Sequence, residues 1–209
     1  MKVLVLCDDH WHPASTVKGG LAPLEELGYS FEYIEDAMNW SAEEMEKYPV
    51  VILSKSNNIS STDTKPWMTD EVQKAFQAYV DNGGSLLAIH SGTADYKETT
   101  ILRPLLGGVF INHPEQCLVT MEMVPDHHLT EGCDDYTLKD EHYFMALDDK
   151  LADIFMRTTS VNGIQPGGWT RNHGKGRVCV ITPGHNLEIW LHPSFQRMVQ
   201  NALKWCTSL

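Results

Sequence analysis

The sequence has little positive charge and no long hydrophobic run. It contains 16 Lys and Arg against 28 Asp and Glu, which gives a formal net charge of −12. This balance argues against nucleic acid and anionic membranes as partners, because both attract a basic face. No apolar stretch approaches the roughly 18 residues that a membrane span requires. The segment 1–7 has one Lys, a short apolar run and no small-residue cleavage site, so we expect a first strand rather than a signal peptide.

Several motifs with a known chemistry are also absent. The five cysteines are odd in number and include no C-x-x-C pair, which predicts buried reduced thiols and a cytoplasmic location. There is no H-E-x-x-H zinc motif, and Gly174-Lys175-Gly176 lacks the spacing of a phosphate loop and predicts a hairpin turn. Without repeats, linkers or low-complexity segments, residues 1–209 are expected to form a single domain.

What the sequence does contain is an alternation of strand and helix patterns. Apolar runs at 3–7, 31–34, 50–53 and 86–89 predict strands, and helical periodicity predicts helices at 17–27, from Thr69 onward and after Pro193. This order predicts an α/β fold, a doubly wound and mostly parallel sheet with helices on both faces. In the second half, 168–171 and 177–182 flank the glycine turn and predict an added β-hairpin or edge segment.

The stretch 82–92 is the one around which the fold and the site are expected to be organised. Leu86 to Ile89 form a continuous apolar run, typical of a strand buried on both faces, and His90 and Ser91 follow it directly. Ligand sites of open α/β sheets lie at the carboxyl ends of such strands. His90 and Ser91 are therefore predicted to lie at a site; the alternative is that His90 only caps a core strand.

Three of the ten histidines follow predicted strands. These are His12, His90 and His185, which are expected to converge at one edge of the sheet. Neutral imidazoles suit zinc, and an added carboxylate such as Glu141 suits manganese or iron. One divalent metal (Zn, Mn or Fe) held by His12, His90 and His185 is a hypothesis; the alternative for each histidine is a structural or acid–base role.

Two further patterns leave alternatives open. Ser91 lies at a sharp turn, with His185 and either Glu188 or Glu141 downstream, as a serine hydrolase requires, but the G-x-S-x-G motif is absent. Its hydroxyl could instead bind ligand or cap the following helix. Trp169 and Arg171 lie in one strand-like segment, which is either an edge strand or a platform on which a sugar stacks.

Taken together, these segments resemble the ThuA-like, or trehalose utilisation, family, which is similar in fold to the class I glutamine amidotransferases. The matching segments are 83–91, Asn112-His113-Pro114, 140–143, 169–178, Gly184-His185 and the final helix ending at Lys204-Trp205, and His12 also fits. The resemblance implies a flavodoxin-like core and a role in carbohydrate catabolism. Amidotransferases have a catalytic Cys where this sequence has His90, so glutamine hydrolysis is not expected.

The resulting hypothesis is an enzyme, a hydrolase or an isomerase or lyase, that acts on a sugar or keto-sugar by His and Glu acid–base chemistry, with metal assistance as an option. His185 and Glu141 would exchange protons with the substrate, and His90 and His12 would orient it or hold the metal. The predicted catalytic residues are His90, Glu141 and His185, and the predicted substrate-binding residues are His12, Ser91, His113, Asp140, Trp169 and Arg171. Among these, Asp140 is expected to support the residues that touch the substrate, and Trp169 and Arg171 are expected to be lesser contacts. The expected partners are a small-molecule carbohydrate and a second copy of the chain in a homo-oligomer.

Two alternatives from other classes of protein stay open. The first is a non-catalytic sugar-binding or regulatory protein on an amidotransferase-like scaffold, because a fold does not fix a function. The second is a serine hydrolase that uses Ser91.

Overall fold

The structure, a computed structural model, describes residues 1–208, and its largest feature is a nine-stranded sheet. The strand order is β2-β1-β3-β4-β11-β10-β9-β6-β7. The first five strands in this order are parallel: β2 (Ser30–Ile34), β1 (Lys2–Leu6), β3 (Val50–Leu53), β4 (Ser85–Ile89) and β11 (Gly176–Ile181). Their order is that of flavodoxin-like folds, 2-1-3-4-5 in sequence order, so the predicted α/β class is confirmed.

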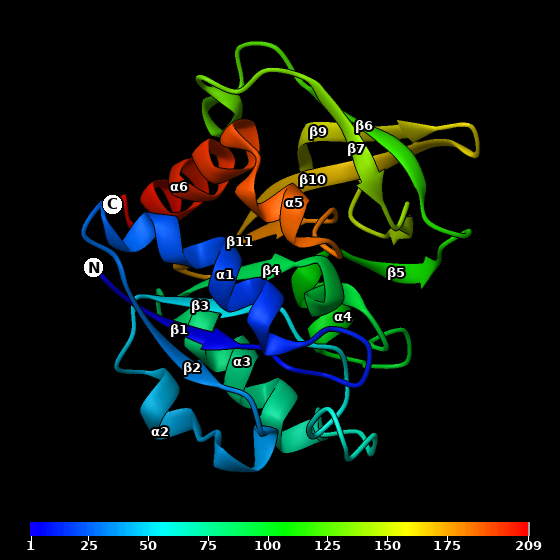
Figure 1. Ribbon diagram of the computed structural model, residues 1–209. Helices are drawn as coiled ribbons and strands as arrows, with labels where there is room; N and C mark the ends of the chain where they lie inside the picture. The colour runs from blue at the N-terminus through cyan, green and yellow to red at the C-terminus, as the bar shows by residue number, and fades with distance from the viewer. Residues whose placement is uncertain (209) are drawn as a thin grey trace.

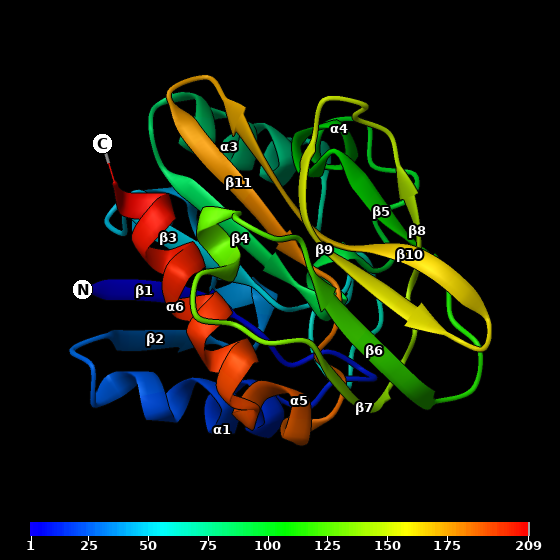
Figure 2. The same cartoon turned by 90° about the horizontal axis from the view of Figure 1, so that it is seen from above.

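The remaining strands of the sheet form an antiparallel extension. These are β10 (Gly163–His173), β9 (Asp153–Ser160), β6 (Cys117–Met123) and β7 (Tyr136–Asp140). The predicted hairpin is the β10–β11 pair, and the extension beyond it is larger than the sequence indicated. Figure 2 shows β6, β9 and β10 on the side of the molecule away from β1 and β2. A separate pair, β5 (Gly108–Asn112) and β8 (Phe144–Leu147), was not predicted.

Helices cover both faces of the parallel strands (Figure 1). One face packs against α1 (Ala14–Glu25), α5 (Leu187–Leu191) and α6 (Pro193–Thr207), and the other against α2 (Ala42–Met45), α3 (Asp70–Asp81) and α4 (Leu102–Leu106). Short 3-10 helices occupy Ala37–Asn39, His90–Thr93 and His128–Thr130 (η1, η2 and η3). Successive side chains of a strand point to opposite faces of the sheet. Since helices cover both faces, every residue of β3 and β4 is buried.

The helix ends follow from local chemistry. The Thr69 side chain accepts a hydrogen bond from the Val72 amide at the start of α3, and Gly107, with φ of 80°, ends α4. Pro193 occupies the first turn of α6, where its missing N–H costs nothing. Within residues 1–208, no helix combines the length and the apolar character needed to cross a membrane.

Candidate functional site

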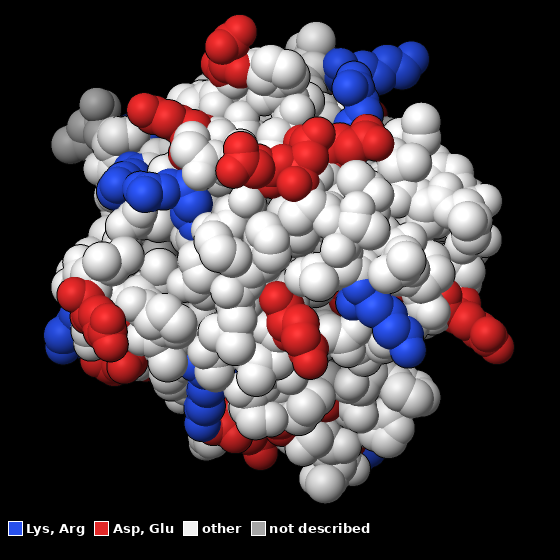
Figure 3. Space-filling view, turned by 45° about the horizontal axis from the view of Figure 1, so that its top comes forward, with Lys and Arg blue, Asp and Glu red and all other residues white. Residues whose placement is uncertain are grey.

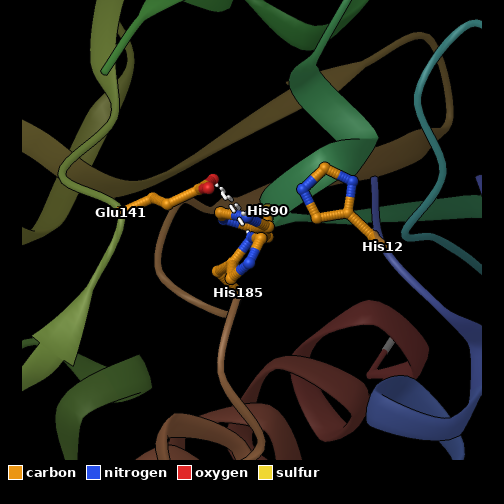
Figure 4. Close-up of side chains that lie close together, drawn as sticks. All are labelled: His12, His90, Glu141 and His185. Carbon is orange, nitrogen blue, oxygen red and sulfur yellow. Dashed lines mark ion pairs between the residues drawn. The ribbon is translucent and has the colours of Figure 1, made fainter. Parts of the chain in front are cut away.

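Four predicted site residues meet at the carboxyl edge of the parallel strands. They are His12 in the loop after β1, His90 at the end of β4, Glu141 just after β7 and His185 in the loop after β11 (Figure 4). One nitrogen of each histidine and one oxygen of Glu141 lie within 4.8 Å of one another. The parallel strands bring the three histidines together, and the antiparallel extension brings the carboxylate to them.

His90 lies on a strained elbow between β4 and η2. Its φ is 49°, a left-handed conformation that few residues other than glycine adopt. The elbow is tightly packed, because a Cβ on Gly92 would lie 1.9 Å from the Leu53 carbonyl oxygen. Strain of this kind is held by its surroundings and gathers at functional sites. The elbow thus holds His90 at the carboxyl end of β4, beside the other residues of the cluster.

The His90 ring has a fixed orientation and a low pKa. Its Nδ1 lies 2.9 Å from the Thr182 carbonyl oxygen, so we assign the proton to Nδ1, which donates to that oxygen and leaves Nε2 toward the cluster. Burial lowers the pKa of His90 to about 4, although the nearby Glu141 opposes this effect. At neutral pH the ring is therefore uncharged, with a lone pair on Nε2.

His12 is oriented by the buried carboxylate of Asp9. Its Nδ1 lies 2.8 Å from Asp9 Oδ1, which leaves Nε2 toward the cluster. Asp9 also accepts hydrogen bonds from the main-chain amides of Trp11, His12 and Ser56, at 2.8–3.0 Å. Burial alone raises the pKa of Asp9, but the His12 and amide hydrogen bonds outweigh it and hold the pKa well below its usual range.

Glu141 is shared by three histidines. Its Oε2 lies 3.1 Å from His185 Nδ1 and 3.5 Å from His90 Nε2, and its Oε1 lies 3.6 Å from His113 Nε2. Burial raises the pKa of Glu141, and the histidines outweigh this and hold it well below its usual range. The carboxylate in turn raises the pKa of His185.

Two of these close approaches do not have hydrogen-bond geometry. Within residues 1–208, His90 Nε2 and His185 Nδ1 are buried atoms that make no hydrogen bond, although Glu141 is near both. Buried polar atoms are rarely left in this state, because each costs about 1–3 kcal/mol. Nitrogen and oxygen atoms that point toward one another without forming hydrogen bonds are typical of a site that binds a metal ion or a ligand between them.

Asp140 holds the loop that carries His185. Its carboxylate accepts hydrogen bonds from the main-chain amides of Gly184 at 2.8 Å, His185 at 3.0 Å and Asn186 at 3.3 Å. Burial raises the pKa of Asp140 to about 7, against the opposing effect of hydrogen bonds from the main-chain amides of Gly184, Glu141 and Asn186. Asp140, which the sequence placed among the substrate-binding residues as a partner behind the direct contacts, is fully buried behind the loop and positions His185.

The cluster opens into a cavity of about 520 Å³, within the range of small-molecule pockets. The lining residues are Trp11, His12, Ala94, Asp95, Phe110, His113, Glu141, Tyr143 and His185. The Tyr143 ring stacks on His90 with ring centroids 4.1 Å apart, and its hydroxyl is 3.5 Å from His12 Nε2. Another hollow, of about 560 Å³ around Tyr48 and Gly84, lies at the opposite ends of the strands, away from the cluster.

Three further predicted site residues are not brought to the cavity. Ser91 is fully buried, and its hydroxyl has no hydrogen-bond partner within residues 1–208, so no base is in place to activate it. Trp169 is also fully buried, and its indole N–H donates to a main-chain carbonyl at 2.9 Å. Arg171 lies 3.0 Å from Asp149 and donates to main-chain carbonyls of α4. The structure therefore gives Trp169 and Arg171 packing roles in place of the predicted substrate contacts.

Five lining residues were not predicted from the sequence: Trp11, Ala94, Asp95, Phe110 and Tyr143. Trp11 is next to His12 and Tyr143 is in the matched segment 140–143, so proximity could have indicated both. Asp95 and Phe110 come from η2–α4 and β5, and no pattern in the sequence marks them.

The chain was compared with known proteins. The family model described as ThuA, trehalose utilisation, matches residues 2–206. A ThuA-like protein from Bacteroides uniformis is similar in structure, with a TM-score of 0.74 and 21% identity over 100% of this chain and 91% of that one. A ThuA-like protein from Parabacteroides merdae has a TM-score of 0.76 and 17% identity over 99% and 89%.

A protein from Salmonella typhimurium described as cytoplasmic has a TM-score of 0.73 and 17% identity, over 99% of both chains. Among curated proteins, none matches the sequence significantly. At these identities the structural likenesses show the fold alone.

Proposed function

We propose that this chain, which belongs to the ThuA or trehalose utilisation family, is an enzyme that acts on a sugar or keto-sugar and holds one divalent metal ion. The observation that carries the proposal is the convergence of His12, His90, His185 and Glu141 donor atoms within 4.8 Å. The family's description supports a carbohydrate as the substrate, and the cavity beside the cluster supports a small one.

The residues present fit a metal ion. Three imidazole nitrogens and one carboxylate oxygen form a donor set that suits zinc, manganese or iron. Metal-binding histidines usually donate their second ring N–H to a carboxylate or a carbonyl, as His12 does to Asp9 and His90 does to Thr182. The unbonded state of His90 Nε2 and His185 Nδ1 also supports this assignment.

A bound divalent ion would supply a Lewis acid that polarises a carbonyl or hydroxyl oxygen of the substrate. The chain itself would move the proton. His113 Nδ1 lies 2.8 Å from the Pro114 carbonyl oxygen, which leaves Nε2 in the cavity as a proton acceptor. The Tyr143 hydroxyl, also in the cavity, would donate a hydrogen bond to the substrate.

A metal-free version of the same enzyme is the second candidate. The 3.1 Å approach of His185 Nδ1 to Glu141 Oε2 favours it, because a histidine beside a carboxylate exchanges protons near neutral pH. In this version His185 and Glu141 would act as the acid–base pair, as the sequence analysis expects. Metal content and chelator sensitivity separate the two.

The proposed partner is a small carbohydrate. Figure 3 shows charges of both signs scattered over one face of the molecule with no continuous basic patch there, so this face does not favour nucleic acid. The cytoplasmic location and the homo-oligomer stay predictions. A non-catalytic sugar-binding role would show as binding without turnover.

Turnover of a panel of sugars and keto-sugars tests the proposal. Protein stripped with a chelator would be assayed before and after addition of zinc, manganese or iron, beside His185→Ala. His173→Ala is the matched control, because His173 pairs with Asp81 in the β10–β11 turn, outside the cluster. We expect turnover that returns with one metal, is lost in His185→Ala and is kept in the control. Full turnover in His185→Ala would contradict both versions.

A further inference from the structure

The mouth of the cavity carries a large exposed aromatic ring. Trp11 lines the cavity and is 66% exposed, whereas Trp67, Trp169 and Trp190 are almost completely buried. The Trp11 amide donates to Asp9 Oδ1 at 2.9 Å, which anchors the main chain of the loop, and the His10 ring packs edge-on against the indole with ring centroids 4.5 Å apart. The loop after β1 therefore holds an apolar face open to solvent beside the cluster, which is the position of a ring that binds ligand.

Asp95 also lines the cavity, in a conformation held by its neighbours. It has φ of 61°, a value uncommon outside glycine. The adjacent Tyr96 is fully buried and donates its hydroxyl hydrogen to the Lys55 carbonyl at 2.7 Å, which anchors the segment. Asn57 reaches only the main-chain oxygen of Asp95, at 3.4 Å, and within residues 1–208 no hydrogen bond or ion pair engages the Asp95 carboxylate. An exposed carboxylate that lines a cavity and that no protein group engages is an acceptor open to a ligand.

The charge of the cavity limits what can enter. Its lining has two carboxylates, Asp95 and Glu141, and neither Lys nor Arg. The buried cation Lys55 donates to the main-chain oxygens of Asp8 and Glu35 and does not line the cavity. Proteins commonly bind phosphate and carboxylate groups with Arg or Lys, and neither lines this mouth to receive such a group.

We propose that Trp11 and Asp95 form a subsite that binds the ring of an uncharged sugar and selects it over phosphorylated or carboxylated sugars. The C–H face of the ring stacks on the Trp11 indole, and neighbouring hydroxyls donate hydrogen bonds to the Asp95 carboxylate, which only accepts. Figure 4 shows the cluster that the bound ring would face. The inference rests on the proposed function for the carbohydrate and the site, but not on the metal.

The test compares binding by Trp11→Ala and Asp95→Asn with that of the whole wild-type chain. Calorimetric titrations would use uncharged sugars and keto-sugars, each matched by its phosphate or uronic acid. Asp126→Asn is the control, because Asp126 has the same left-handed backbone, with φ of 60°, in an exposed turn outside the cavity. Asn tolerates this conformation, so neither Asn variant adds strain. Trp11→Phe keeps an aromatic face and should recover most of the binding.

We expect Trp11→Ala to weaken binding of the uncharged sugar roughly 3- to 10-fold. Asp95→Asn should weaken binding of the uncharged sugar roughly 10-fold or more. It should also reduce the ratio of affinities for the uncharged sugar and its phosphate, because the substitution removes a negative charge that repels the phosphate. The metal content of both variants should equal that of the wild type. Wild-type affinity in both variants, or a wild-type preference for the charged sugars, would overturn the subsite and leave the proposed function standing. If the wild type binds neither uncharged nor charged sugars, both proposals fail. If the protein contains no metal but the two variants lose sugar affinity as expected, the subsite is supported and only the metal assignment is wrong.

Discussion

Replacing Asp9 with Asn tests whether the Asp9 carboxylate orients His12 for metal binding in addition to stabilising the fold. Asp9 Oδ1 faces His12 Nδ1 and the amides of Trp11 and His12, and Oδ2 faces the Ser56 amide at 2.8 Å. An Asn side chain has one acceptor and one donor. If its oxygen takes the Oδ1 place, its NH₂ group points at the Ser56 N–H, and two donors meet in a buried position.

The cost of Asp9→Asn follows from these contacts. One buried donor without a partner costs about 1–3 kcal/mol, which for a chain of this size lowers the Tm by roughly 2–12 °C. Loss of the carboxylate behind a metal-binding histidine lowers metal affinity about 10- to 100-fold. The loss of stability tests the hydrogen bonds of Asp9 in the fold, and the loss of metal affinity tests the proposed function. The two quantities are therefore measured separately.

Urea unfolding in the presence of a chelator gives the first quantity, and metal titration of the folded protein gives the second. The control is Asp36→Asn, because Asp36 accepts one amide hydrogen bond at a 3-10 helix start, where Asn serves as well. Equal stability and equal metal affinity in Asp9→Asn and wild type would refute this reasoning. Lower stability with unchanged metal affinity would contradict only the metal assignment of His12.

The pH dependence of this difference has a defined sign. The pKa of Asp9 is held below its unfolded value, so the stability that the carboxylate contributes is present above the unfolded pKa of about 3.9 and is lost as pH falls toward the folded pKa. The difference in free energy of unfolding between wild type and Asp9→Asn, measured with chelator present, should therefore be largest at neutral pH and shrink below about pH 4.

Four further substitutions are expected to have defined outcomes. Gly20→Ala in α1 would place a Cβ 2.4 Å from the Trp190 side chain and should cost about 1–3 kcal/mol in urea unfolding, while Gly19→Ala, whose Cβ meets only the end of a flexible side chain, should be tolerated. Trp169→Phe should destabilise by about 1–3 kcal/mol, because a buried carbonyl loses its donor, yet leave sugar affinity unchanged in titrations. Ser91→Ala should keep turnover and lose no stability, and a serine-directed fluorophosphonate should leave the wild type unlabelled.

Much of the fold could be predicted because a strand that is buried on both faces of the sheet has an apolar residue at nearly every position. The runs 50–53 and 85–89 are apolar at nearly every position because helices cover both sides of β3 and β4. The meeting of His12, His90 and His185 follows from the same topology, since each comes after a parallel strand and such strands end at one edge.

The rest depends on how the second half of the chain pairs, which periodicity does not reveal. Glu141 follows β7 at the far end of the strand order, and its place in the cluster depends on an antiparallel extension whose register the sequence does not mark. Trp169 illustrates the same limit. An aromatic residue on a strand can face solvent or core, and here β10 lies inside the sheet, so the indole packs under α4.

Elemental analysis of the untagged protein, purified without chelator, tests the central claim most directly. The wild type would be compared with the His12→Ala/His185→Ala double variant and with His173→Ala as the control, each checked for folding by circular dichroism. We expect near-stoichiometric zinc, manganese or iron in wild type and control, and loss of that metal in the folded double variant. A metal-free wild type that stays metal-free when zinc, manganese and iron are added, or a double variant that keeps its metal, would contradict it.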